Sequence, residues 1–85
     1  MSRLKVRRIG EGLHPSEVVV AVATADGPEE EVTVDGRSLS GDTLEVGHPI
    51  SRSEDRVLIE LPRETMRGSW RLWVPADALT EERSS

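Results

Sequence analysis

The stretch from Arg56 to Val74 constrains the fold most, because it predicts a β-hairpin whose pairing follows from its own residues. One alignment of the two arms brings three apolar pairs onto one face: Leu61 with Trp70, Ile59 with Leu72, and Val57 with Val74. The same alignment sets Glu60 opposite Arg71, which is an opposite-charge pair. A slip of one residue would send every apolar side chain to the other face. We therefore expect all six apolar residues to be buried together.

Alternating apolar and polar residues predict further strands. They cover Arg3–Ile9, Glu17–Thr24, Glu30–Val34 and Asp42–Val46. A turn at residues 26–28 would set Val22 opposite Val32 and Val20 opposite Val34. Six short strands, with at most one short helical turn after Pro75, predict an all-β fold. We expect a small six-stranded barrel or compact sandwich of SH3-like size.

The chain of 85 residues predicts one small β domain over residues 1–80, followed by a frayed tail at 81–85. Residues 3–39 and 40–79 resemble each other, since each half has a strand, a His-Pro segment, a hairpin and a turn. Val32 and Leu72, like Leu39 and Leu79, lie forty residues apart. One interpretation is a tandem duplication; the other is that short strands and turns produce such matches by themselves.

The composition excludes several classes of function. The sequence has no Cys, so disulfides and thiolate chemistry are excluded. The net charge of −5 argues against a nucleic-acid-binding protein, which is usually basic. The longest apolar run, Val18–Ala23, is too short to span a membrane, and residues 1–12 contain no apolar signal region. We expect a cytoplasmic protein without membrane contact.

The sequence contains no motif for catalysis. His14 and His48 both precede Pro in connecting segments, and no cluster of further ligands would complete a zinc site. Ser16, Ser40 and Ser51 lie near these histidines, but no local pattern joins a nucleophile to a base and an orienting group. We therefore expect no enzyme, no metal and no cofactor.

A protein-binding surface is the function that the sequence favours. The Pro62–Ser69 loop is longer than a minimal hairpin needs, and long loops on a rigid scaffold often bind partners. Trp73 and Leu58 lie on the hairpin's outer face, where a Trp beside an apolar neighbour is typical of an interface or a homodimer contact. The predicted binding residues are Trp73, Leu58, Arg63, Met66 and Arg67. The alternative for Trp73 is that Ala76 and Leu79 cover its ring.

A nucleic-acid-associated regulatory protein is the alternative function. The first strand carries Arg3, Lys5, Arg7 and Arg8, which could contact phosphates. No aromatic residue is interleaved among them to stack on bases. Ion pairing within the protein, for example with residues 29–31, would equally account for these basic residues.

Two short segments resemble known families. GDTLEV (41–46) resembles the swapped-hairpin barrels of antitoxin-type transcription regulators, although this sequence lacks that family's helix. VPADAL (74–79) resembles the turn before the last strand of SH3-like barrels. Each resemblance covers six residues and implies a small barrel only, so no site residue is carried over from either family.

Overall fold

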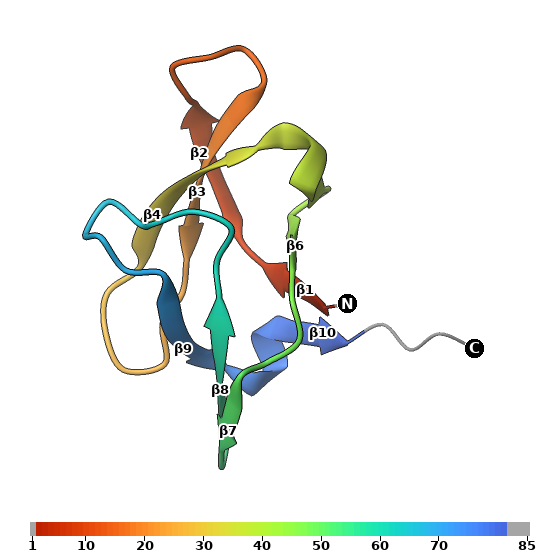
Figure 1. Cartoon of the computed structure of the whole chain (residues 1–85), viewed down its shortest axis with the longest axis vertical. Helices are drawn as coiled ribbons and strands as arrows, with labels where there is room; N and C mark the ends of the chain where they lie inside the picture. Colours follow the sequence, from red (N-terminus) through yellow and green to blue (C-terminus); the bar gives the residue numbers. More distant parts are fainter. Residues whose placement is uncertain (1, 82–85) are drawn as a thin grey trace.

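The computed structural model describes residues 2–81, which form an all-β fold of short strands (Figure 1). The strands are β1 (Ser2–Lys5), β2 (Arg7–Glu11), β3 (Glu17–Val22), β4 (Glu30–Asp35), β5 (Leu39–Ser40), β6 (Thr43–Val46), β7 (Ser51–Ser53), β8 (Arg56–Glu60), β9 (Arg71–Pro75) and β10 (Leu79–Glu81). Two 3-10 turns, η1 (Gly36–Ser38) and η2 (Ala76–Ala78), each follow a long hairpin. Glu81 belongs to β10, and the rest of the predicted tail lies outside the described residues.

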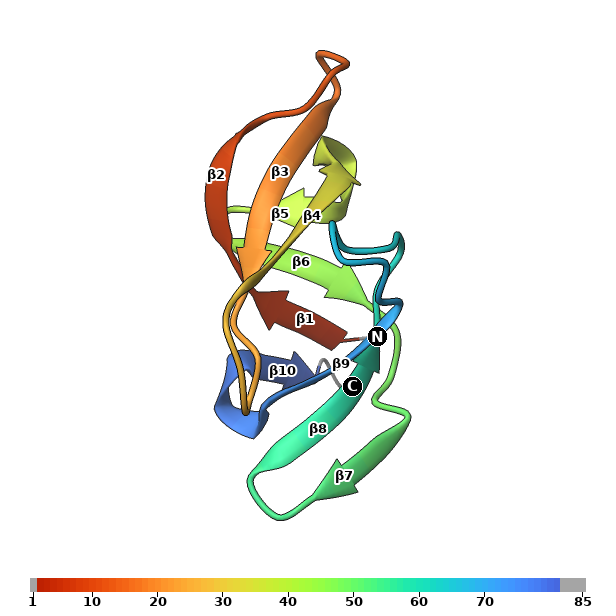
Figure 2. The ribbon, with the colours of Figure 1, turned by 90° about the vertical axis from the view of Figure 1, so that its left-hand side faces the viewer.

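The strands form three antiparallel sheets, with orders β10-β1-β6-β5, β2-β3-β4 and β7-β8-β9. Figure 2 shows the four-stranded sheet lying across the middle, with one three-stranded sheet above it and the other below. Among residues 2–81, none of these sheets closes into a barrel. The prediction of six strands is wrong, because Val6 divides the first strand between two sheets and three short strands were not predicted. The short helical turn expected after Pro75 is present as η2, and η1 is a similar turn within the first half of the chain.

The register predicted for the hairpin of β8 and β9 is confirmed. Val57 lies opposite Val74, and Arg71 donates from Nε to the Glu60 carboxylate at 3.2 Å. The expected burial of Trp70 is wrong, because its side chain is 50% exposed. The ladder ends at the Glu60–Arg71 pair, and only one backbone hydrogen bond continues beyond it, from Leu61 N to Trp70 O. Trp70 therefore leaves the inner face before the sheet can bury it.

The hairpin of β3 and β4 is displaced by two residues from the predicted register. Val20 lies opposite Val32, and Val18 lies opposite Val34, so the connecting loop is longer than the predicted turn. A shift of two residues keeps each side chain on its original face. Val20, Val22, Val32 and Val34 are therefore buried as expected.

One hydrophobic cluster joins all three sheets. It contains Leu4, Val6, Val20, Val22, Val32, Val34, Leu44, Val46, Val57, Ile59, Leu61, Leu72 and Val74. The cluster is dominated by β-branched and Leu side chains from facing strands, and it contains no aromatic ring. Each sheet contributes only a few residues, so no sheet has a core of its own.

The strand pairing of the first half recurs in the second half at an offset of forty residues. Leu39 pairs with Leu44 between β5 and β6, and Leu79 pairs with Leu4 between β10 and β1. Leu4 and Leu44 pair with each other at the centre of the sheet. These pairings are those of an approximate twofold axis between Leu4 and Leu44.

Other contacts follow the same axis. Gly36 N donates to Ser16 O before η1, and Ala76 N donates to Asp55 O before η2, each at 2.8 Å. The two His-Pro segments do not follow it. His14-Pro15 lies between β2 and β3, whereas His48-Pro49 lies between β6 and β7.

The two long hairpins hold each other through their loops. Ala25 N, in the β3–β4 loop, donates to Trp73 O at 2.8 Å. Met66 N, in the β8–β9 loop, donates to Glu31 O at 2.8 Å, and Thr65 forms a β-bridge with Val32. Figure 1 shows both loops on the same side of the molecule, each beside the other hairpin.

Candidate functional site

The β8–β9 loop is an ordered turn organised around Thr65, which is only 5% exposed. The Thr65 hydroxyl donates to the Glu30 carboxylate at 2.7 Å and accepts from Ser69 N at 3.1 Å and Arg67 N at 3.3 Å. Gly68 adopts φ +85, in the left-handed region that glycine tolerates best, and its N donates to Thr65 O. The loop is therefore held in one shape on the rigid edge of β4.

This turn exposes two large apolar side chains. Met66 is 68% exposed and Trp70 is 50% exposed, and the exposed Arg67 lies between them in the sequence. The Arg67 guanidinium makes no hydrogen bond or ion pair within the part of the chain that the structure describes. Met, Trp and Arg are enriched at the centres of protein interfaces.

Arg63 anchors the base of the loop. Its guanidinium lies 2.7 Å from the carboxylate of Glu17, a side chain that is only 14% exposed. The hydrogen bond from Arg63 is the main reason that the pKa of Glu17 is lowered from its ordinary value. Arg63 was predicted to bind a partner, and the structure places it in a contact that holds the loop against β3.

Trp73 and Leu58 lie opposite each other on the outer face of β8 and β9, and both are half-buried. The β3–β4 loop lies beside Trp73 and, with Arg71 and Ser69, lines a shallow depression there. Ala76 and Leu79 pack against the core cluster. Trp73 therefore borders the β3–β4 loop, and it is Trp70 that the structure exposes beside Met66.

Sequence reasoning missed Trp70 because it placed this residue on the buried face. The available signal was its position directly after the loop, where a hairpin ladder often ends. The burial of Thr65 had no such signal, because nothing in the sequence places it against β4.

The basic residues of the first strand divide between two sheets. Arg3 and Lys5 lie on β1, whereas Arg7 and Arg8 lie on β2 beyond Val6. Arg7 forms an ion pair with Glu29 at 2.6 Å, and this contact lowers the pKa of Glu29. Arg8 Nε donates to Gly41 O at 2.9 Å. The predicted basic face is therefore interrupted, and Arg7 and Arg8 both have partners within the protein.

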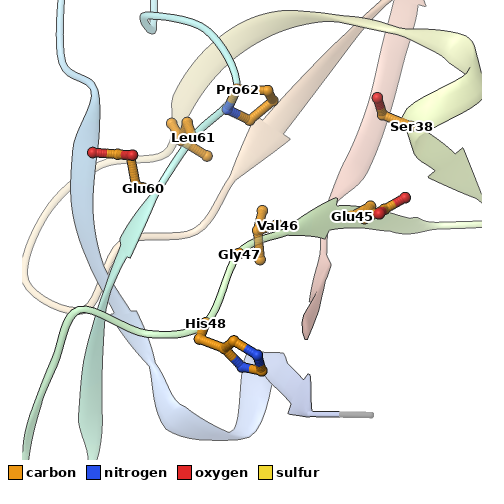
Figure 3. A pocket seen from close by; sticks show the side chains of 8 residues that line it. All are labelled: Ser38, Glu45, Val46, Gly47, His48, Glu60, Leu61 and Pro62. Carbon is orange, nitrogen blue, oxygen red and sulfur yellow. The ribbon is translucent and has the colours of Figure 1, made fainter. Parts of the chain in front are cut away.

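A shallow cleft of about 530 Å³ lies between the end of β6 and the end of β8 (Figure 3). Val46, Leu61 and Pro62 line it, and Glu45 lies at one side. Glu60 also borders the cleft, but Figure 3 shows its carboxylate pointing toward β9, consistent with its ion pair to Arg71. Ser38 and His48 lie at different ends of the cleft in that view, so they do not form a nucleophile–base pair.

No group of three or more His, Asp or Glu side chains that could hold a metal ion occurs in residues 2–81. Within that same range, no helix has the length and apolar character needed to cross a membrane. Comparison with known proteins found no matching family model, no similar curated protein and no similar solved structure.

Proposed function

We propose that this chain is a protein-binding module and that the β8–β9 loop is its contact surface. The observation that carries the proposal is the ordered Thr65 turn, which exposes Met66, Arg67 and Trp70. A loop already fixed in its bound shape loses little conformational entropy when a partner binds. Met66 and Trp70 leave much of their apolar surface exposed, and neither belongs to the hydrophobic core cluster.

The proposal favours protein over nucleic acid for a physical reason. The loop combines apolar area with one guanidinium, that of Arg67, which has no partner among residues 2–81, whereas nucleic-acid sites rely on several cations along a groove. Arg7 and Arg8 already have partners within the protein. The net charge of −5 further opposes approach to a polyanion.

Comparative affinity capture tests this proposal. Three full-length baits are needed: the native chain, the Met66→Ala/Trp70→Ala variant and the control Leu13→Ala. Leu13 is 99% exposed on the β2–β3 turn, so the control removes an exposed apolar side chain elsewhere. A protein captured by the native and control baits, and lost from the loop variant, supports the proposal. Equal capture by all three baits, or no capture by any, contradicts it.

The nucleic-acid alternative has its own measurement. Fluorescence anisotropy with mixed-sequence DNA and RNA oligonucleotides would report binding at near-physiological salt. Phosphate contacts would make the affinity fall steeply as salt rises. Binding that is salt-dependent and lost in Arg3→Ala/Arg7→Ala would favour that alternative.

A further inference from the structure

The approximate twofold axis relates two clefts on the surface. The first is the cleft of Figure 3. The second, of about 200 Å³, is lined by Lys5, Val6, Arg7, Ala21, Ala23, Glu29 and Ala78. Five of these residues correspond to residues of the first cleft at the offset of forty: Lys5 to Glu45, Val6 to Val46, Arg7 to Gly47, Ala21 to Leu61 and Ala78 to Ser38. The same fold geometry therefore produces a cleft in each half.

The two clefts carry opposite charges at the equivalent position. Glu45 in the first cleft is half-buried, and Lys5 in the second is exposed. Neither side chain forms a hydrogen bond or ion pair with another described residue. In the first cleft, Val46 and Leu61 form an apolar floor beside Glu45, since they are only 4% and 3% exposed. We name this first site the Glu45 cleft.

The β8–β9 loop complements the Glu45 cleft in two respects. The loop exposes the apolar side chains of Met66 and Trp70, and the cleft has an apolar floor. The loop carries Arg67 and the cleft carries Glu45, and neither charged group has a partner among residues 2–81. The loop begins at Leu61 and Pro62, which also line the cleft, so the two surfaces adjoin on one molecule.

We propose that two copies of this chain form a closed dimer in which each β8–β9 loop occupies the Glu45 cleft of the other copy. This inference rests on the proposed function and names a second copy as the partner. Adjoining complementary surfaces suit a twofold interface, in which the same contact is made twice. Arg67 lies against Glu45 in this arrangement. Both loops and both Glu45 clefts are then occupied, so association stops at two copies.

Charge reversal in the full chain tests the dimer. Sedimentation velocity over a concentration series should show a dimer for the native chain. Arg67→Glu and Glu45→Lys should each weaken it at least about tenfold, because like charges then face each other. An equimolar mixture of these two variants should associate again, since both loop–cleft contacts in the mixed dimer are complementary. The double variant Arg67→Glu/Glu45→Lys should likewise recover the dimer.

Matched controls separate contact from net charge. Lys5→Glu changes the charge as Arg67→Glu does, and Glu11→Lys changes it as Glu45→Lys does, yet both should leave the dimer intact. Glu45 lies opposite Arg3 in the sheet, so Glu45→Lys places two positive charges on opposed residues. Circular dichroism must therefore show that this variant folds. Glu45→Gln removes the charge without reversing it and should still weaken the dimer at least about tenfold.

Three results would overturn the dimer. They are a monomeric native chain at all concentrations, a dimer that survives Arg67→Glu, and failure of both the mixture and the double variant to associate. A monomeric native chain that still captures another protein through Met66 and Trp70 would overturn the dimer alone and leave the proposed function standing.

Discussion

Leu4 and Leu44 lie directly opposite each other in neighbouring strands, and both are fully buried. Each also pairs on its other side with a second leucine, Leu4 with Leu79 and Leu44 with Leu39. The four side chains form one row across the central sheet. Positions forty residues apart therefore have nearly the same surroundings, and mutations at them can be compared directly.

Leu4→Ala and Leu44→Ala should destabilise the protein by similar amounts, about 2–5 kcal/mol each, because both leave a cavity in the same layer. The stability loss of the double variant should differ from the sum of the two single losses, since the two side chains contact each other's surroundings in the core. Urea denaturation measures all three. Leu13→Ala, at a fully exposed position, should change stability by less than about 0.5 kcal/mol. A near-neutral Leu44→Ala would contradict the equivalence.

The twofold relation predicts that a circular permutant folds. Ser2 pairs with Glu81 at the open ends of β1 and β10, just as β5 and β6 pair beside their short turn. Joining Glu81 to Ser2 through Asn-Gly supplies a tight hairpin turn, and the chain is then opened between Gly41 and Asp42. Circular dichroism and a cooperative thermal transition should match those of the native chain. A permutant opened inside β8 is the control and should not fold.

Thr65→Val should destabilise the protein by about 1–3 kcal/mol, because the buried hydroxyl satisfies two backbone N–H groups and the Glu30 carboxylate. The substitution preserves shape, so any cost comes from lost hydrogen bonds. Urea denaturation measures it. Thr80→Val, on an exposed strand position, should be close to neutral. Equal stability of both variants would show that the loop does not depend on Thr65.

Acid should weaken the contacts that hold the loop and the first strands. The folded pKa values of Glu17 and Glu29 lie below the ordinary value of 4.5, because Arg63 and Arg7 stabilise the ionised carboxylates. Their stabilisation is complete above pH 4.5 and is lost as the pH falls through the folded values. An NMR titration of the carboxyl carbons should show Glu17 returning toward 4.5 in Arg63→Gln. Arg67→Gln should leave it unchanged.

The two Trp residues should differ in solvent contact. Trp73→Phe leaves only Trp70, which is 50% exposed, whereas Trp70→Phe leaves the half-buried Trp73. Fluorescence of Trp73→Phe should lie at longer wavelength and be quenched more strongly by iodide. Shorter-wavelength and less quenched emission from Trp73→Phe than from Trp70→Phe would show that Trp70 is the buried tryptophan.

The sequence predicted the β8–β9 register because that hairpin combines apolar pairs with the Glu60–Arg71 charge pair, so only one alignment satisfies all of them. The β3–β4 hairpin lacked such a marker. Val18, Val20 and Val22 lie on one face and are interchangeable as partners, because a shift of two residues preserves the buried face. The buried residues of this hairpin were therefore predicted correctly, although its register was not.

The candidate site was predicted only in part. Met66 and Arg67 lie in a loop whose length was visible in the sequence. The exposure of Trp70 was not visible, because it depends on where the ladder ends and on the loop turning toward β4. That turn depends on the Thr65–Val32 bridge, which joins residues more than thirty positions apart. No local pattern encodes such a contact.

The central row of leucines has a consequence for how the protein is made. Leu4 leaves the ribosome before Leu44 and Leu79, yet it needs Leu44 on one side and Leu79 on the other. Strand β1 must therefore remain unpaired on its outer side until β10 has been synthesised. Contacts between such distant residues also slow folding. A nascent chain stalled before Leu79 should expose the apolar face of β1 to chaperones.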